Sequence, residues 1–292
     1  MGVLWHNSAT KSFLKLNYTM SHDHDAQKKY EIATHALVPL VTMLFVQMLL
    51  NYTTAPANMI FISPYLLVFL VAIVISIFVL WKGQICPGQA GRLLFVFKFF
   101  LVFAVGNLAY SLAFTPKHIP MAMVSIAAIL ISLIYWNVSN TERLTNATAY
   151  GCFAICGLAI VQYLAIYWVE IPSLFNGIRA NNFAQLLLGI LLAGWYLMLA
   201  KSRLDGFFKL LVQLALLVLI LNYVWVAFVL YQQLQMMPEM SLVPYLIYFG
   251  IQFVIFAILA WLLLGKGDKQ IKNPLGWSAA LALAMLYPFT NI

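Results

Sequence analysis

One basic residue, Lys98, is set well inside an apolar stretch, residues 93–114. It lies six residues past Arg92, which is about 9 Å along a helix. An ammonium group at that depth is typical of a site for an anionic substrate or a counter-ion. A long lysine side chain can also extend along apolar surface and place its charge at the membrane interface. The other residues on its helical face are apolar, which favours the second interpretation, and both stay open.

Three uncharged polar residues also lie inside apolar stretches. Asn107 and Ser111 are four residues apart, so a helix places them on one face. Asn222 lies near the middle of the apolar stretch 207–231. Such residues usually form hydrogen bonds between helices, and fewer of them line the path of a substrate. If the protein binds a substrate, we predict that Lys98, Asn107, Ser111 and Asn222 line its site. Five glutamines invite the same two interpretations: Gln47, Gln162, Gln185, Gln213 and Gln252.

No combination of side chains predicts catalysis. The acidic residues lie at the ends of apolar stretches or between them: Asp23, Asp25, Glu31, Glu142, Glu170, Asp205, Glu239 and Asp268. Proton pumps relay protons through buried carboxylates or histidines, so a proton antiporter is not expected. The tract His22–Asp25 has nothing to fix its geometry, and Cys152 and Cys156 have no third ligand nearby. No catalytic or nucleotide-binding motif is present. We therefore expect no enzyme, no cofactor and no metal site.

The composition requires a membrane. Of the 292 residues, 64% are hydrophobic and only 8% are charged, whereas soluble domains carry about 25% charged residues. About 20 apolar residues cross a bilayer as a helix, and the apolar runs do not alternate as barrel strands do. The fold class predicted is an all-α, polytopic membrane bundle of about nine transmembrane helices. The predicted spans are 33–52, 59–81, 93–114, 119–138, 149–169, 183–200, 207–231, 242–264 and 277–292.

The basic residues predict the orientation. With the N-terminus inside, the outer loops hold only Lys117 and Arg179. The inner segments hold Lys11, Lys15, Lys28, Lys29, Lys82, Arg92, Arg143, Lys201, Arg203, Lys209, Lys266, Lys269 and Lys272. Lysine and arginine accumulate on the cytoplasmic side of membrane proteins. The N-terminus is therefore predicted inside and the C-terminus outside, in a cell inner (plasma) membrane. The same scattering of positive charge along span ends argues against a nucleic-acid partner.

The chain divides into a tail and one membrane domain. Residues 1–32 are polar and are predicted as a cytoplasmic tail, and residues 33–292 form a single transmembrane domain. Met20 opens a segment that reads like a natural start, and the residues before it show no periodic pattern. They are expected to be either a disordered tail or the product of an upstream start codon.

Small and aromatic residues predict how the spans pack. Five glycines would let helices approach closely: Gly151, Gly157, Gly189, Gly194 and Gly250. Four tryptophans fall at predicted inner span ends, as interfacial belts require: Trp81, Trp136, Trp261 and Trp277. Pro64-Tyr65 and Pro244-Tyr245 open the second and eighth spans in the same way, which is the pattern that parallel repeats of a transporter would leave.

Two functions remain after these exclusions. The first is a permease or exporter-like protein for a small or amphipathic substrate, working without ATP. The second is a non-transporting membrane component, either a subunit of a larger complex or a factor in envelope organisation and its permeability barrier. The expected partners are the lipid bilayer with, in the first case, a small amphipathic substrate or bound lipid and, in the second, another membrane protein.

Overall fold

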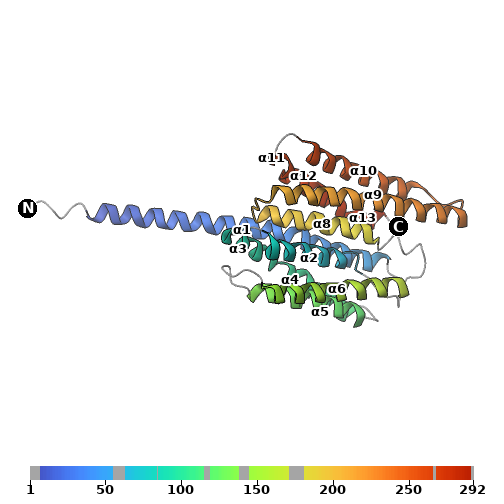
Figure 1. Ribbon diagram of the computed structural model, residues 1–292, viewed down its shortest axis with the longest axis horizontal. Coiled ribbons are helices and arrows are strands. Elements are labelled where there is room, and N and C mark those ends of the chain that lie inside the picture. The colour runs from blue at the N-terminus through green and yellow to red at the C-terminus, as the bar shows by residue number, and fades with distance from the viewer. Residues whose placement is uncertain are drawn as a thin grey trace, which may run out of the picture.

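A computed structural model gives the fold and describes residues 7–54, 63–83, 85–114, 119–137, 145–170, 181–265 and 268–290. Within those ranges the regular structure is helical throughout, and Figure 1 shows long helices lying side by side in one bundle. The helices are α1 (Asn7–Thr54), α2 (Leu66–Lys82), α3 (Pro87–Phe97), α4 (Phe100–Phe114), α5 (Ile119–Asn137), α6 (Asn146–Glu170), α8 (Asn182–Leu199), α9 (Asp205–Met236), α10 (Val243–Leu264), α11 (Asp268–Ile271), α12 (Pro274–Met285) and α13 (Tyr287–Thr290).

Six helical stretches in the described ranges are long and apolar enough to cross a membrane. They are Lys29–Leu50, Pro87–Ala113, Asn146–Ile166, Asn182–Leu199, Asp205–Met236 and Val243–Leu264. Three shorter apolar stretches, Leu66–Lys82, Met123–Ile134 and Pro274–Phe289, coincide with the second, fourth and ninth predicted spans. The all-helical membrane bundle is therefore confirmed, while the count of nine spans stays a prediction.

Helix α1 is longer than the first predicted span. It runs for 48 residues, so it includes the part of the predicted tail from Asn7 on. Between Asn7 and Val38 the sequence has neither glycine nor proline, and a helix once nucleated adds residues cooperatively. Figure 1 shows the first part of α1 projecting beyond all the other helices. This part is helical, which differs from the disorder that was one of the two expectations.

Three predicted spans are interrupted. The third divides at Lys98–Phe99 into α3 and α4, where backbone N–H groups bond three residues back instead of four. The second becomes helical only at Leu66, after the non-helical residues Ser63–Tyr65. The ninth ends its first helix at Met285 and resumes at Tyr287. Non-helical backbone is tolerated at membrane depth only where protein or a water-filled cavity surrounds it, and Ser63–Tyr65 are accordingly buried.

Helix α8 is the centre of the bundle. It packs against α1, α2, α3, α9 and α12, and nearly every side chain from Ala184 to Leu197 is buried. Two of its glycines allow this close packing. A Cβ on Gly189 would lie 2.7 Å from the Cβ of Val71, and one on Gly194 would lie 2.1 Å from the ring of Trp277. The predicted role of glycine in close helix approach is thus confirmed at these two positions.

The same prediction is wrong for three other glycines. A Cβ added to Gly151, Gly157 or Gly250 would meet nothing within 4 Å, so these positions do not bring helices together. Trp277 also departs from its predicted place at an interface. It is fully buried, and its indole Nε1 donates to the carbonyl of Ile271 at 2.8 Å. A residue type enriched at interfaces can equally fill the space that a facing glycine leaves.

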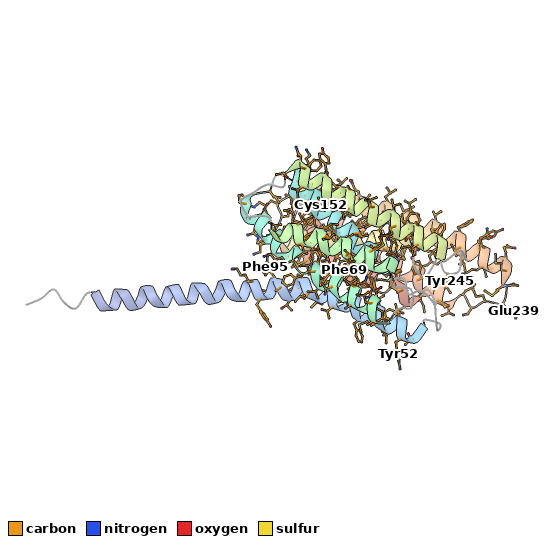
Figure 2. The ribbon with its side chains drawn as sticks, turned by 90° about the horizontal axis from the view of Figure 1, so that it is seen from below. Tyr52, Phe69, Phe95, Cys152, Glu239 and Tyr245 are labelled. Carbon is orange, nitrogen blue, oxygen red and sulfur yellow. The ribbon has the colours of Figure 1, made fainter. Side chains whose placement is uncertain are left out.

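Many of the predicted inner segments meet at one end of the bundle, which we call the basic end. The side chain of Gln89 donates to Lys201 O at 3.2 Å and that of Arg92 donates to Ala200 O at 3.0 Å, while Lys272 forms a salt bridge with Asp205. These contacts join the start of α3, the α8–α9 turn and the start of α12. Figure 2 shows Phe95 toward this end, Phe69 in the interior and Glu239 at the opposite end.

Candidate functional site

A set of buried polar side chains links helices from one side of the bundle to the other, and we call it the polar layer. Its members are Ser125, Asn107, Gln47, Ser63, Tyr163, Gln185, Asn181, Asn222 and Tyr248, each at most 3% exposed. They come from α5, α4, α1, α6, α8, α9 and α10 and from the residues that precede α2 and α8. Buried polar groups in lipid must bond to one another, and here they do so in sequence across the whole bundle.

The first part of the polar layer is centred on Gln47 of α1. Its Nε2 donates to Asn107 Oδ1 at 3.1 Å, and its Oε1 accepts from the hydroxyl of Ser63 at 2.6 Å. Asn107 Nδ2 in turn donates to Ser125 Oγ at 2.8 Å. These bonds join α1, α4, α5 and the segment before α2, so Asn107 works as a link between three helices.

Tyr163 of α6 connects the first part of the polar layer to α8. Its hydroxyl donates to the carbonyl of Ser63 at 3.5 Å and accepts from Gln185 Nε2 at 2.9 Å. Gln185 lies one turn into α8, and its backbone N–H bonds to the carbonyl of Asn181 at 3.1 Å. The layer therefore reaches the first turn of the central helix.

The second part of the polar layer is built on the start of α8. Asn181 Oδ1 caps the helix by accepting from the backbone N–H groups of Phe183 at 2.9 Å and Ala184 at 3.2 Å. Asn181 Nδ2 donates to Asn222 Oδ1 at 2.6 Å, and Asn222 Nδ2 donates to the hydroxyl of Tyr248 at 2.7 Å. The cap thus orients a chain of amides that runs through α9 to α10.

The polar layer lies far from the basic end but still within the apolar length of the helices. Asn181 is 19 residues from Ala200 along α8, about 28 Å. The α9–α10 hairpin continues beyond the layer, because 14 residues, about 21 Å, separate Asn222 from the end of α9 at Met236. Figure 1 shows this hairpin extending past the start of α8.

Two interrupted helices are joined beside the polar layer by a pair of tyrosines, which we call the tyrosine clasp. Tyr65, just before α2, donates from its hydroxyl to the carbonyl of Met285 at 2.8 Å. Tyr287, just after the α12–α13 break, donates to the carbonyl of Pro64. The two rings meet edge to face with centroids 6.2 Å apart. Each tyrosine lies at one of the two helix interruptions, and its hydroxyl bonds to a backbone carbonyl at the other interruption.

The four predicted site residues do not form one site. Asn107 and Ser111 are both buried on α4, and Asn107 and Asn222 belong to the two parts of the polar layer. Lys98 lies apart from them at the α3–α4 elbow. Phe100, two residues on, packs edge to face on Tyr196 with centroids 4.9 Å apart, and Tyr196 is 15 residues, about 22 Å, from Asn181.

Sequence reasoning missed most of the other members. In the sequence Asn181 belongs to a stretch between two apolar runs, although an asparagine directly before an apolar helix is an N-cap signal. Tyr163 and Tyr248 lie inside apolar runs, where nothing distinguishes a tyrosine that bonds from one that only packs. Among the glutamines, Gln47, Gln185 and Gln252 are buried, Gln162 is half-buried and Gln213 is exposed, so Gln213 fits neither of the two interpretations.

Ionisable side chains make no cluster in the part of the chain that the structure describes. No group of three or more His, Cys, Asp or Glu residues there could hold a metal ion. Cys152 and Cys156 are both buried on α6, which suits a packing role. The side chains of His22–Asp25 lie outside the described residues. The chemistry at hand is that of neutral hydrogen-bonding groups.

An all-helical bundle of apolar helices with a buried neutral polar layer defines a multi-pass integral membrane protein, whose outer surface contacts the lipid bilayer. The chain belongs to the integral membrane domain family, whose model matches residues 26–292. It is similar to an uncharacterized protein of Haemophilus influenzae, with 34% identity over 194 residues that cover 65% of this chain and 71% of the relative. No solved structure matches the chain.

Proposed function

We propose that the protein is a permease or exporter for a small or amphipathic substrate and that it works without ATP hydrolysis or other enzymatic chemistry. The observation that carries the proposal is the meeting of two interrupted helices at the tyrosine clasp, directly beside Ser63 of the polar layer. Transporters of several folds bind their substrates at discontinuous helices, because backbone groups leave the helical ladder there and can bind a solute. Asn107, Ser111 and Asn222 are the polar groups of the proposed path.

The proposed topology has nine spans, with the N-terminus inside an inner (plasma) membrane and the C-terminus outside. Two observations support it. The basic end gathers Arg92, Lys201 and Lys272, all predicted to be cytoplasmic. Figure 1 shows α13 at the opposite end of the bundle from the projecting start of α1, as an odd number of spans requires. Accessibility labelling of single cysteines at positions 203 and 239 of a cysteine-free variant in intact cells tests it, with only position 239 expected to react.

The transport proposal is tested in cells that lack the protein and then express it again. Small solutes are profiled inside and outside the cells, and at least one solute should move across the membrane in proportion to the amount of protein. The variant Tyr65→Phe/Tyr287→Phe removes both bonds of the tyrosine clasp and should lose this shift. Tyr223→Phe is the matched control, because Tyr223 also donates to a backbone carbonyl, that of Phe249 at 2.8 Å, but within an unbroken helix.

A second function, a non-transporting subunit, is favoured by one observation. The first part of α1 projects from the basic end beyond all the other helices, where it could contact a partner (Figure 1). Native mass spectrometry after gentle extraction separates the two functions. A stoichiometric partner protein, combined with no solute shift in cells, would replace the transport proposal by the subunit. A chain that is isolated alone with a retained lipid or small molecule supports the permease.

A further inference from the structure

The second part of the polar layer has a fixed hydrogen-bond direction. Because Asn181 Oδ1 accepts two backbone N–H groups of α8, its Nδ2 must face Asn222. The carbonyl of the Asn222 side chain is thereby occupied, and its Nδ2 must face Tyr248. The hydroxyl oxygen of Tyr248 accepts this bond and a longer one, 3.4 Å, from Asn181 Nδ2. The hydroxyl hydrogen of Tyr248 is left over, and it has no acceptor among the described residues.

A buried acceptor without a partner lies one helical turn away. Gln252 follows Tyr248 by four residues on the buried face of α10 and is only 2% exposed. Its Oε1 is buried and has no hydrogen-bond partner in the described part of the chain. Side chains in a helix lean toward its N-terminus, so the side chain of Gln252 is expected to extend toward the turn that carries Tyr248. Asn182 Oδ1, beside Asn181, is a second buried acceptor without a partner among the described residues.

These groups require an occupant of definite chemistry. It must accept a hydrogen bond from Tyr248 and donate one to Gln252, and a single hydroxyl group does both. No charged side chain lies on α8 or α10, and those of α9, Asp205 and Lys209, lie in its first turns, more than 10 residues from Asn222. A charged group would therefore be unpaired at this depth, which is costly. We propose that Tyr248 and Gln252, oriented by Asn181 and Asn222, form a binding site for the hydroxyl group of a neutral polyol or of a lipid headgroup.

This inference does not rest on transport, since a ligand held permanently by a non-transporting membrane component would occupy the same site. It can therefore fail or stand independently of the proposed function. Its test needs only the purified full-length chain, and no solute has to cross the membrane.

The first experiment is a double-mutant cycle on the apparent unfolding temperature in detergent. Tyr248→Phe removes the donor and Gln252→Leu removes the acceptor at similar volume, and each should lower the temperature by about 1–3 °C. Because one occupant bridges both groups, the double variant should be no less stable than the worse single variant. The control cycle combines Tyr248→Phe with Gln233→Leu, since Gln233 bonds to Tyr245 instead, and its effects should add. Additive effects in the first cycle would overturn the proposal.

The second experiment identifies the source of the hydroxyl group. Glycerol and diacylglycerol, a neutral lipid with one headgroup hydroxyl, are added separately to the wild-type protein and to the Tyr248→Phe/Gln252→Leu variant. A polyol site predicts an extra rise in unfolding temperature with glycerol in the wild type alone. A headgroup site predicts diacylglycerol retention in native mass spectra that is about 2- to 10-fold higher in the wild type. Coupling between the two residues with no response to either probe would overturn the ligand site, because bound water alone would then occupy it.

Discussion

The interior of the bundle is built differently on the two sides of its middle. Toward the basic end the interior is aromatic. Phe69 stacks on Phe103 with ring centroids 3.7 Å apart, and Trp277 packs on Phe208 with centroids 5.8 Å apart. Farther from the basic end, the polar layer links neighbouring helices by hydrogen bonds. We call the first region the aromatic core.

The two regions hold helices together by different means. Lipid tails are as apolar as the side chains they replace, so helices in a membrane associate through close packing and hydrogen bonds. In the aromatic core the helices are held by close packing of side chains, which tolerates no change of volume. The polar layer uses directed bonds, each of modest energy, and its partners can be exchanged for those of a ligand. Function is therefore more easily placed in the polar layer, and stability in the aromatic core.

The largest expected effect is the loss of a ring from the aromatic core. Phe69→Ala removes contacts with Phe103 and Phe100 and leaves a cavity, which should cost about 3–5 kcal/mol of unfolding free energy. Phe78→Ala is the control, because Phe78 is 45% exposed toward lipid and should cost far less. Unfolding of both variants in detergent measures the difference. Equal losses would mean that the aromatic core is not what holds the helices together.

The next effect is overpacking in the same region. Gly194→Ala would place a methyl group 2.1 Å from the fully buried ring of Trp277, which cannot move aside, so about 1–3 kcal/mol should be lost. Gly250→Ala is the matched control, since nothing lies within 4 Å of its added Cβ. Thermal stability measured by fluorescence-detected gel filtration compares the two. A Gly194→Ala variant as stable as Gly250→Ala would contradict this packing.

A smaller loss of stability is expected in the polar layer, with a larger loss of function. Asn222→Leu breaks the bonds to Asn181 and Tyr248, and hydrogen bonds between membrane helices contribute about 0.6 kcal/mol on average and at most about 1.7. Solute movement in the cell assay should nevertheless disappear. Gln213→Leu on the same helix is the control, because Gln213 is exposed and should be neutral in both measurements. Normal solute movement in a stable Asn222→Leu variant would remove Asn222 from the path.

The contrast between the two regions also explains what the sequence can predict. Hydropathy identifies the apolar segments because the bilayer imposes their length and composition on each segment separately. The amides Gln47, Asn107 and Asn222 can be recognised because a polar residue in an apolar run stands out. The hydrogen-bond partners of these amides cannot be predicted from the sequence. Gln47 and Asn107, for example, are 60 residues apart and come together only because α1 and α4 pack side by side.

The helix interruptions were harder to predict for a related reason. The break at Lys98–Phe99 contains neither proline nor glycine, so no local signal marks it. The non-helical turn at Ser63–Tyr65 is stabilised from a distance by Tyr287, 223 residues from Pro64. Similarly, Gly194 and Gly250 both lie in apolar runs, and the sequence does not distinguish them. Only Gly194 has to be a glycine, because the ring of Trp277 fills the space that a Cβ would take. The apparent repeat of Pro64-Tyr65 and Pro244-Tyr245 stays a prediction. The two tyrosines have different partners, since Tyr65 bonds to the carbonyl of Met285 and Tyr245 bonds to the side chain of Gln233.

The smallest effect is expected at Lys98, the residue with the most unusual position in the sequence. It lies at the α3–α4 elbow on the aromatic side of the bundle, nine residues or about 13 Å from Asn107 along α4 and about 22 Å from the level of Asn181, so it lies beyond hydrogen-bond reach of a ligand in the polar layer. Lys98→Met keeps the aliphatic stem and removes the charge. The unfolding free energy should change by no more than about 0.5 kcal/mol and solute movement should persist. Lys98→Arg is the control that keeps the charge. If solute movement were lost in a stably folded Lys98→Met variant and retained in Lys98→Arg, a cationic site at the elbow would have to be added to the path, and the division of labour between the two regions would fail.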